Sequence, residues 1–200
     1  MLRIIAGEAK RVLLNVPEGV EVRPTSDKIK GAIFSALGSL EGARVLDLCS
    51  GSGNLGLEAL SRGAEEVVMI ERVPDFCRNI TNNLHNVTKS IIGFGSRTAD
   101  DIKAKVINAD AVDAPKLLAS KKKFYDVIFA DPPYIPKANQ KGPRDFLFDK
   151  RLAEFVHEDA ILILESGPEA VSNLPEDLSW KLIRRKNYGS TTSLTYWRLK

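Results

Sequence analysis

Short apolar runs alternate with helical patterns through most of the chain, and this alternation limits the possible folds more than any other feature. The strand-like runs lie at residues 43–49, 65–71, 102–110, 124–131 and 160–166. The helical patterns between them lie at residues 54–63, 74–87, 111–120 and 145–157. Such an order predicts a parallel sheet with right-handed crossovers and helices on both faces. The expected fold class is therefore α/β and doubly wound.

The first residues form a separate pattern. Residues 2–7 and 10–17 have the composition of a short β-hairpin, and they lead into a helix over residues 22–37. Thr25 or Ser26 can serve as the N-cap of that helix, because a hydroxyl can accept from a free N–H of the first turn.

The remaining segments complete the expected organisation. We interpret residues 1–40 as an N-terminal extension and residues 41–200 as the main domain. Residues 179–189 and 191–200 are separated by a Gly-Ser turn and predict a terminal antiparallel hairpin. Residues 88–101 are rich in Gly, Ser and Thr, which predicts a mobile loop.

The composition fits one domain. The chain has 200 residues, 44% of them hydrophobic and 28% charged, which is ordinary for a soluble protein with a substantial core. No apolar run approaches the roughly 20 residues that span a bilayer, and the first residues lack a secretory signal, so we expect a cytoplasmic protein. Cys49 and Cys77 have no metal-ligand spacing, which predicts reduced thiols and no zinc site.

The basic residues are unevenly distributed. The net charge of +3 is too small to establish a nucleic-acid partner, but residues 178–200 contain six basic residues and no acid. Other basic clusters lie at Lys10 and Arg11, at Lys121 to Lys123, and at Lys137, Lys141 and Arg144. Each cluster alone can be solvated surface. Several clusters near one candidate site favour a polyanionic partner.

A glycine motif follows the first strand of the main domain. In "DLCSGSGNLG", residues 47–56, the three glycines Gly51, Gly53 and Gly56 match G-x-G-x-x-G between a strand and a helix. Glu71 ends the next strand 20 residues after Gly51, where a carboxylate can accept from ribose hydroxyls. Together these residues predict an adenosine-containing ligand, and the alternative is a tight strand-to-helix turn alone.

The acid before the glycines helps to separate two cofactors. Asp47 would repel the pyrophosphate of a nicotinamide dinucleotide, but it could hold the ammonium group of S-adenosylmethionine directly or through water. The alternative is an acid satisfied by local backbone donors. Asp110 is placed to accept from an adenine amino group, although it could equally cap the following helix. The predicted cofactor-binding residues are Asp47, Ser50, Gly51, Gly53, Glu71, Arg72, Asp110 and Ala111.

The segment "ADPPYIPK", residues 130–137, ends the fourth strand, because proline is excluded from central strands. With the glycine motif, it resembles S-adenosylmethionine-dependent methyltransferases, in which Asp/Asn-Pro-Pro-Tyr/Phe marks members that methylate exocyclic amino nitrogens. The resemblance implies that Asp131 and the Pro132 carbonyl accept from the amine and direct its lone pair at the methyl group. Pro133 would hold the turn rigid, and Tyr134 would stack on the base.

A closer resemblance covers nearly the whole chain. "RIIAGEAKR", "RPTSDKIKGAIFSAL", "LDLCSGSGNLGLEALSRGA", "DPPY" and "YGSTTSLTYWR" are similar to segments of the RsmD-type bacterial methyltransferases. That resemblance implies a Rossmann-like seven-stranded class I methyltransferase sheet and methylation of a guanine N2 in 16S ribosomal RNA. It implies that Arg23, Thr25 and Lys28 lie near the cofactor pocket or the RNA. The other expected RNA contacts are Lys10, Arg11, Lys137, Arg184, Arg185 and Lys186.

Other interpretations remain open from the sequence. Within the fold, the alternative is adenine N6 methylation of DNA or RNA. Outside it, the alternatives are a nicotinamide oxidoreductase and a non-catalytic RNA-binding Rossmann domain. Cys49 is expected to pack as a small side chain, and His85 and His157 to serve surface or packing roles. We expect a monomer that binds S-adenosylmethionine and ribosomal RNA, with no metal and no membrane contact.

Overall fold

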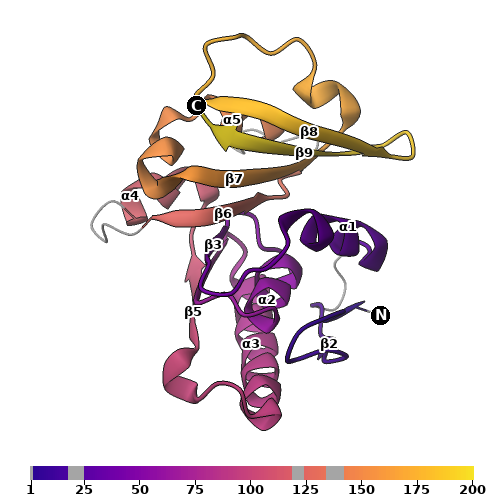
Figure 1. Ribbon diagram of the computed structural model, residues 1–200, viewed down its shortest axis with the longest axis vertical. Helices are drawn as coiled ribbons and strands as arrows, with labels where there is room; N and C mark the ends of the chain where they lie inside the picture. The colour runs from indigo at the N-terminus through magenta and orange to yellow at the C-terminus, as the bar shows by residue number, and fades with distance from the viewer. Residues whose placement is uncertain (1, 18–24, 119–123, 134–141) are drawn as a thin grey trace.

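The computed structural model describes residues 2–17, 25–118, 124–133 and 142–200, and within them the chain builds one seven-stranded sheet (Figure 1). The strands lie in the order β5-β4-β3-β6-β7-β9-β8. The first five of these are parallel, whereas β9 is antiparallel to both of its neighbours. The strands are β3 (Arg44–Asp47), β4 (Glu66–Glu71), β5 (Lys103–Asn108), β6 (Tyr125–Ala130), β7 (Val156–Ser166), β8 (Trp180–Tyr188) and β9 (Thr192–Leu199). The predicted parallel sheet with a terminal antiparallel hairpin is confirmed.

Helices cover both faces of this sheet. The helices are α1 (Asp27–Leu37), α2 (Asn54–Ser61), α3 (Pro74–Phe94), α4 (Ala114–Leu118) and α5 (Pro143–Phe148). Buried side chains of α1, α2 and α3 join one hydrophobic cluster, and those of α4 and α5 join a second. Residues 127–130 of β6 alternate between the two clusters, with Val127 in the first and Ile128 in the second. This alternation is the period of two that places both faces of a strand in a core.

The strand order creates a switch point. From β3 the chain continues to β4 and β5 on one side, and it then returns to β6 and β7 on the other side. The crevice between β3 and β6 therefore opens at their carboxyl ends, where open α/β sheets bind ligands. Asp47 ends β3, and Asp131 directly follows β6.

The N-terminal hairpin is shorter than the sequence predicts. Its strands, β1 (Leu2–Arg3) and β2 (Leu13–Leu14), contain two residues each and pair antiparallel. The ladder is short because the backbone N–H groups of Ile5 and Ala6 donate to the carboxylate of Glu58, at 2.8 and 3.0 Å, instead of to a strand. Helix α2 thus anchors the hairpin to the main domain.

Helix α1 begins at Asp27, and its N-cap is Ser26, whose hydroxyl accepts from the N–H of Ile29 at 3.3 Å. This bond settles the choice between Thr25 and Ser26 in favour of Ser26. Part of the predicted helix, residues 22–24, lies outside the described residues.

The predicted mobile loop at residues 88–101 is wrong in its first half. Helix α3 continues to Phe94 and ends at Gly95, which has a φ of 88°. Val87 and Ile91 are fully buried one turn apart, so the apolar face of the helix extends past its predicted end. A short 3-10 helix, η1 (Ala99–Asp101), follows and is capped by Thr98.

The single helix predicted at residues 145–157 is also wrong. Helix α5 ends at Phe148, and the side chain of Asp149 accepts from the N–H of Arg151 at 3.2 Å to start a 3-10 helix, η4 (Lys150–Phe155). Strand β7 then begins at Val156, four residues before the apolar run that predicted it. An aspartate that bonds to nearby backbone N–H groups ends a helix and starts a new turn.

The connections that remain are short. The 3-10 helix η2 (Ala111–Asp113) leads into α4, and η5 (Pro168–Val171) follows β7.

None of the helices in the described ranges is both long and apolar enough to cross a membrane.

Candidate active site

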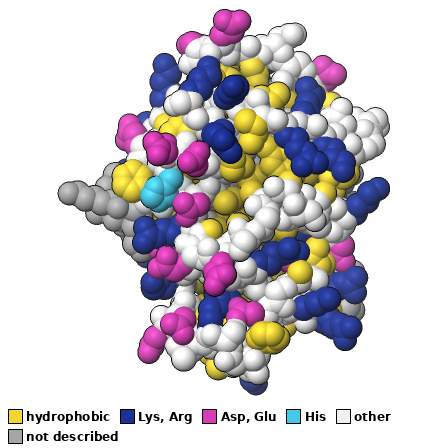
Figure 2. Space-filling view, in the orientation of Figure 1, with side chains coloured by type: hydrophobic (Ala, Val, Ile, Leu, Met, Phe, Trp, Pro, Cys, Tyr) yellow, Lys and Arg dark blue, Asp and Glu magenta, His cyan; other side chains and the backbone are white. Residues whose placement is uncertain are grey.

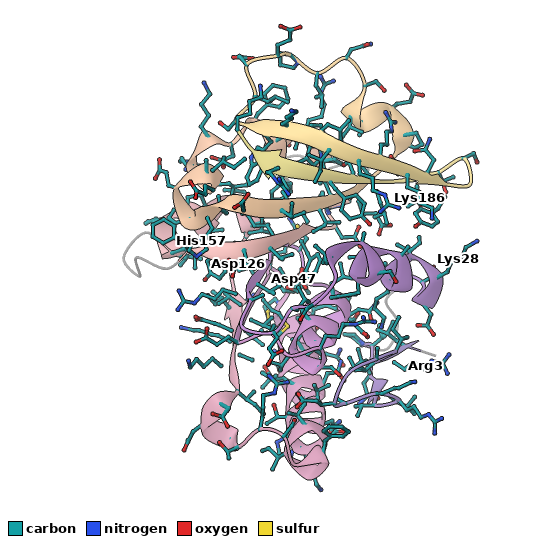
Figure 3. The ribbon with its side chains drawn as sticks, viewed as in Figure 1. Arg3, Lys28, Asp47, Asp126, His157 and Lys186 are labelled. Carbon is teal, nitrogen blue, oxygen red and sulfur yellow. The ribbon has the colours of Figure 1, made fainter. Side chains whose placement is uncertain are left out.

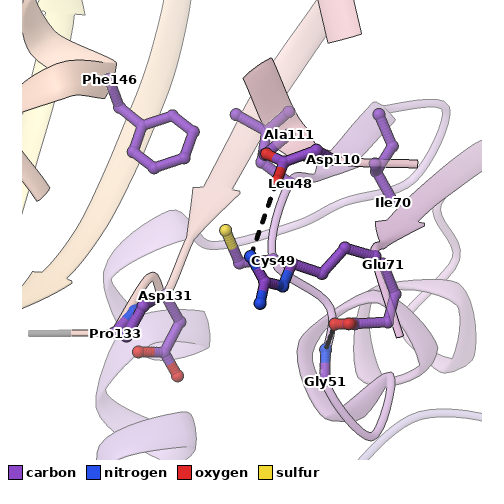
Figure 4. A pocket seen from close by; sticks show the side chains of 11 residues that line it. Leu48, Cys49, Gly51, Ile70, Glu71, Asp110, Ala111, Asp131, Pro133 and Phe146 are labelled. Atoms are coloured by element: carbon purple, nitrogen blue, oxygen red, sulfur yellow. Dashed lines mark hydrogen bonds and ion pairs between the residues drawn. The ribbon is translucent and has the colours of Figure 1, made fainter. Parts of the chain in front are cut away.

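A pocket opens at the carboxyl edge of the sheet, where the loops after β3, β4, β5 and β6 meet (Figure 4). Its lining combines apolar side chains with three acids. The lining residues are Leu48, Cys49, Gly51, Ile70, Glu71, Arg72, Asp110, Ala111, Asp131, Pro133 and Phe146. Seven of the residues predicted from the sequence to bind cofactor or act on substrate are among them: Gly51, Glu71, Arg72, Asp110, Ala111, Asp131 and Pro133.

The glycine loop forms the turn that the motif predicts. Gly51 and Gly53 have φ values of 51° and 79°, in the left-handed region that favours glycine. Gly56 has a different reason to lack a side chain, because a Cβ there would lie 2.7 Å from the Cγ of Met69. Two glycines therefore shape the turn, and the third lets α2 pack closely on β4.

Glu71 connects the glycine loop to the end of β4. One carboxylate oxygen accepts from the N–H of Gly51 at 2.9 Å, and the other accepts from the N–H of Val73 at 2.8 Å. The side chain is buried but lines the pocket. Because a carboxylate has about four acceptor positions, two remain for the hydroxyls of a ligand.

Asp47 is the last residue of β3 and comes shortly before the glycine loop in the chain (Figure 3). Its carboxylate accepts from the N–H of Gly56 at 3.1 Å, and neither Asp47 nor Ser50 nor Gly53 belongs to the pocket lining among the described residues. Burial raises the pKa of Asp47 to about 7. The sequence left open whether local backbone donors satisfy Asp47, and the bond from Gly56 is such a contact. A contact between Asp47 and the ammonium group of a ligand stays a prediction.

Asp110 has two partners at the end of β5. One oxygen accepts from the N–H of Val112 at 3.1 Å and caps η2, and the other lies 3.7 Å from a guanidinium nitrogen of Arg72 (Figure 4). The capping role expected from the sequence is confirmed. Ala111 follows in the same lining, and an adenine contact by Asp110 stays a prediction.

Asp131 faces the pocket from the end of β6. The hydroxyl of Thr25 lies 3.3 Å from its Oδ2. Burial, together with the nearby acids Glu165 and Asp47, raises the pKa of Asp131 well above its ordinary value. Pro132 is buried and Pro133 lines the pocket, and the role of the two prolines in holding this turn stays a prediction.

Cys49 also lines the pocket, directly after β3. Burial and the neighbouring carboxylates of Asp47 and Asp131 raise the pKa of its thiol well above its ordinary value. A protonated thiol is a poor nucleophile, which agrees with the interpretation of Cys49 as a packing residue.

The predicted RNA contacts are dispersed. Lys10, Arg11 and Lys28 are exposed on the N-terminal part, and Arg184, Arg185 and Lys186 are exposed on β8. Figure 3 shows Lys28 and Lys186 projecting on the same side of the molecule. Figure 2 shows Lys and Arg side chains gathered around an apolar area on the face that carries the terminal hairpin and α1. Arg23, Tyr134 and Lys137 lie outside the described residues.

One residue of the pocket lining and one contact beside it were not found from the sequence. Phe146 of α5, only 1% exposed, contributes an aromatic wall to the pocket. Thr25, which was expected near the cofactor pocket or the RNA, is buried, and its contact with the pocket residue Asp131 was not foreseen. An apolar residue in a short helix has no sequence signal that distinguishes a pocket wall from ordinary core.

The chain is similar to known proteins over nearly its whole length. The family model described as "Conserved hypothetical protein 95" matches residues 2–197. YlbH of Bacillus subtilis, named as an rRNA methyltransferase, is 33% identical over 198 residues, which cover 98% of both chains. Ribosomal RNA small subunit methyltransferase D of Escherichia coli is 29% identical, with 98% of this chain and 90% of that protein covered.

Solved structures agree with these relatives. The protein yhhF of Escherichia coli, named as a methyltransferase, superposes with a TM-score of 0.75 at 27% identity, with 100% of this chain and 98% of that chain covered. A hypothetical protein of Thermus thermophilus gives a TM-score of 0.71 at 28% identity, with 98% of each chain covered. The family match, the relatives and the pocket at the switch point agree, and the chain belongs to the conserved hypothetical protein 95 family of RsmD-type methyltransferases.

Proposed function

We propose that this protein transfers the methyl group of S-adenosylmethionine to the exocyclic N2 of a guanine in small-subunit ribosomal RNA. The observation that carries the proposal is a pocket in which Glu71, the last residue of β4, and Asp131, directly after β6, both line the wall. In this proposal Glu71 would accept from an adenosine ribose, and Asp131 would accept from the target amine. The relatives named as rRNA methyltransferases support the substrate class.

The residues of the pocket fit this cofactor better than a dinucleotide. Glu71, Asp110 and Asp131 surround the cavity with carboxylates, which favour a cationic sulfonium and disfavour a pyrophosphate. Glu71 would hold the ribose hydroxyls, Asp110 the adenine amino group, and Leu48 and Ile70 would contact the apolar faces of the ligand. When bound, S-adenosylmethionine supplies an electrophilic methyl group.

The protein's contribution to chemistry is to orient a poor nucleophile. The lone pair of a guanine amino group is delocalised into the ring, and the base must leave its stack to reach a buried pocket. Asp131 and the Pro132 carbonyl would accept from the amine N–H bonds, which turns the lone pair toward the methyl group. Tyr134 is proposed to stack on the extruded base.

The proposed substrate also implies where and how the protein acts. Ribosomal RNA would place it in the bacterial cytoplasm. We propose that it acts as a monomer and that the transfer requires no metal. We also propose that residues 1–40 act as the RNA-contacting and cofactor-contacting extension of a domain at residues 41–200.

The decisive experiment identifies the methylated nucleoside. The protein is incubated with labelled S-adenosylmethionine and, separately, with naked 16S RNA, small subunits and duplex DNA, and the products are digested. Label in N2-methylguanosine from RNA or subunits is expected. Label in N6-methyladenine would instead assign an adenine methyltransferase.

Cofactor preference gives a prediction that does not require RNA. S-adenosylhomocysteine should bind and raise the melting temperature, whereas NAD should do neither.

Glu71→Ala should weaken S-adenosylhomocysteine binding by about 1–3 kcal/mol, because buried hydroxyls lose a charged acceptor. Calorimetry measures both effects, with Glu65→Ala, directly before the first residue of β4, as the control. Equal affinity in the Glu71 variant would remove this residue from the site.

The basic strand gives a second prediction. Replacing Arg184, Arg185 and Lys186 with Gln should weaken RNA binding and reduce the dependence of log K on log salt by about 0.7–0.9 for each phosphate that the variant no longer neutralises. A matched triple Gln variant of Lys89, Lys103 and Lys105, near the opposite edge of the sheet, should leave the slope unchanged. Equal slopes in both variants would assign the three β8 residues to ordinary surface charge.

A further inference from the structure

Thr25 joins the N-terminal extension to the proposed catalytic carboxylate. It is 6% exposed, and its hydroxyl lies 3.3 Å from the Oδ2 of Asp131, 106 positions further along the chain. A carboxylate oxygen only accepts, so the hydroxyl is the donor. Ser26 supplies the helix cap, which leaves the Thr25 hydroxyl available for this contact.

A chain of buried polar contacts holds Thr25 in place. Its backbone carbonyl accepts from the side-chain amide of Asn54, the first residue of α2, at 3.1 Å. The Asn54 carbonyl oxygen in turn accepts from Nζ of Lys30 at 2.7 Å, and Lys30 pairs with Glu58 at 3.3 Å. Lys30, Asn54 and Glu58 are all at most 4% exposed. Helix α2, which follows the glycine loop, therefore holds the backbone of Thr25 in place.

We propose that Thr25 is a positioning residue for Asp131: its hydroxyl holds one carboxylate oxygen, so that the other points at the target amine. The inference rests on the proposed function, because it takes Asp131 as the group that accepts from that amine. It changes the role of the N-terminal extension, which then completes the catalytic site in addition to any contact with RNA.

The charges around Asp131 explain why this donor matters. Among the described residues, the Thr25 hydroxyl contacts the carboxylate, and the groups that interact with it electrostatically are Glu165 on β7, Asp47 at the end of β3 and the Cys49 thiol. Burial and the two acids raise the pKa of Asp131, and the hydrogen bond from Thr25 lowers it. Loss of the Thr25 hydroxyl should therefore raise the Asp131 pKa further. Only the ionised carboxylate can accept from Thr25 with one oxygen and from the target amine with the other, so a smaller fraction of the protein would be active at neutral pH.

The first test does not depend on the substrate. Thr25→Val removes the hydroxyl at nearly constant volume, and Thr25→Ser retains it. The protein is labelled with ¹³C-carboxyl aspartate, the Asp131 resonance is assigned with Asp131→Asn, and its pKa is measured in each variant without RNA. We expect a higher Asp131 pKa in Thr25→Val than in the wild type and a nearly wild-type pKa in Thr25→Ser. Thr98→Val, which removes a hydroxyl that donates to the Asp101 carboxylate in η1, should leave the Asp131 pKa unchanged. An identical Asp131 pKa in wild type and Thr25→Val would overturn the proposal.

The second test measures single-turnover methyl transfer with saturating cofactor. Thr25→Val should lower the rate roughly tenfold at neutral pH, the effect of losing one hydrogen bond to a charged group, and should move the acid limb of the pH profile to higher pH. Thr25→Ser should restore both, while affinity for S-adenosylhomocysteine stays constant in every variant. A reduced rate with an unmoved acid limb would show a merely structural role and reject the proposal. If the wild type methylates a different nucleoside, the proposed function fails, while the carboxyl titration still decides whether Thr25 positions Asp131.

Discussion

Asp131→Ala is expected to lower the single-turnover rate of methyl transfer by about 10²–10³-fold, while affinity for S-adenosylhomocysteine changes little. The loss is large because Asp131 is proposed to act on the amine in the transition state, where its carboxylate directs the lone pair. The affinity should hold because the proposed ribose acceptor is Glu71, which ends a different strand. Rapid-quench transfer assays, paired with calorimetry, separate the two effects.

Asp126 provides the matched control for this variant. It lies on the same strand, β6, but near the amino end, where its carboxylate accepts from the N–H of Arg44 at 2.7 Å (Figure 3). Asp126→Asn keeps an oxygen for that N–H and should transfer methyl groups at the wild-type rate. Transfer by Asp131→Ala at close to the wild-type rate would contradict the assigned role of the carboxylate.

Glu58→Gln is expected to lower the free energy of unfolding by about 3–5 kcal/mol, because it leaves the buried ammonium of Lys30 without its anion. Both side chains of this pair are fully buried, and burial already lowers the pKa of Lys30. The Glu58 carboxylate also accepts from the N–H groups of Ile5 and Ala6 and from Arg62 at 2.8 Å. Such a loss is a large fraction of the total stability of a typical domain.

Urea unfolding measures this effect against an exposed pair. Lys103 and Glu65 lie 2.8 Å apart with side chains that are 54% and 38% exposed. Solvent screens such a pair, so Lys103→Gln should unfold at nearly the wild-type urea concentration. If Glu58→Gln were as stable as Lys103→Gln, the buried pair would not anchor the N-terminal hairpin.

The fold could be predicted from the sequence wherever a pattern is local and periodic. The alternation of apolar runs indicated the parallel part of the sheet because a strand buried on both faces is a continuous apolar segment. The errors at residues 88–101 and 145–157 have tertiary or local side-chain causes. Ile91 extends α3 because it packs on the core, and Asp149 ends α5 because its side chain bonds to the backbone two residues ahead.

In the candidate site too, features with a local sequence pattern could be predicted, whereas features that depend on tertiary packing could not. The pairing of Gly51 with Glu71 was predictable, since a fixed spacing between strand ends reflects the geometry of the βαβ unit. The contact between Thr25 and Asp131 was not, because no periodicity connects residues 106 positions apart. Phe146 was missed for a similar reason, since its place in the pocket wall depends on how α5 packs.

The two outer strands of the sheet, β5 and β8, have a consequence for how copies of the chain meet in concentrated solution. An outer strand exposes unpaired backbone groups that can add a strand from another molecule, and lysine or arginine side chains discourage this by mutual repulsion. Strand β5 carries Lys103 and Lys105, and β8 carries Lys181, Arg184, Arg185 and Lys186. The β8 cations proposed to bind RNA therefore also oppose fibrillar self-association. Bound RNA would neutralise these cations, and it would then have to cover the β8 edge itself to keep other chains from pairing with it.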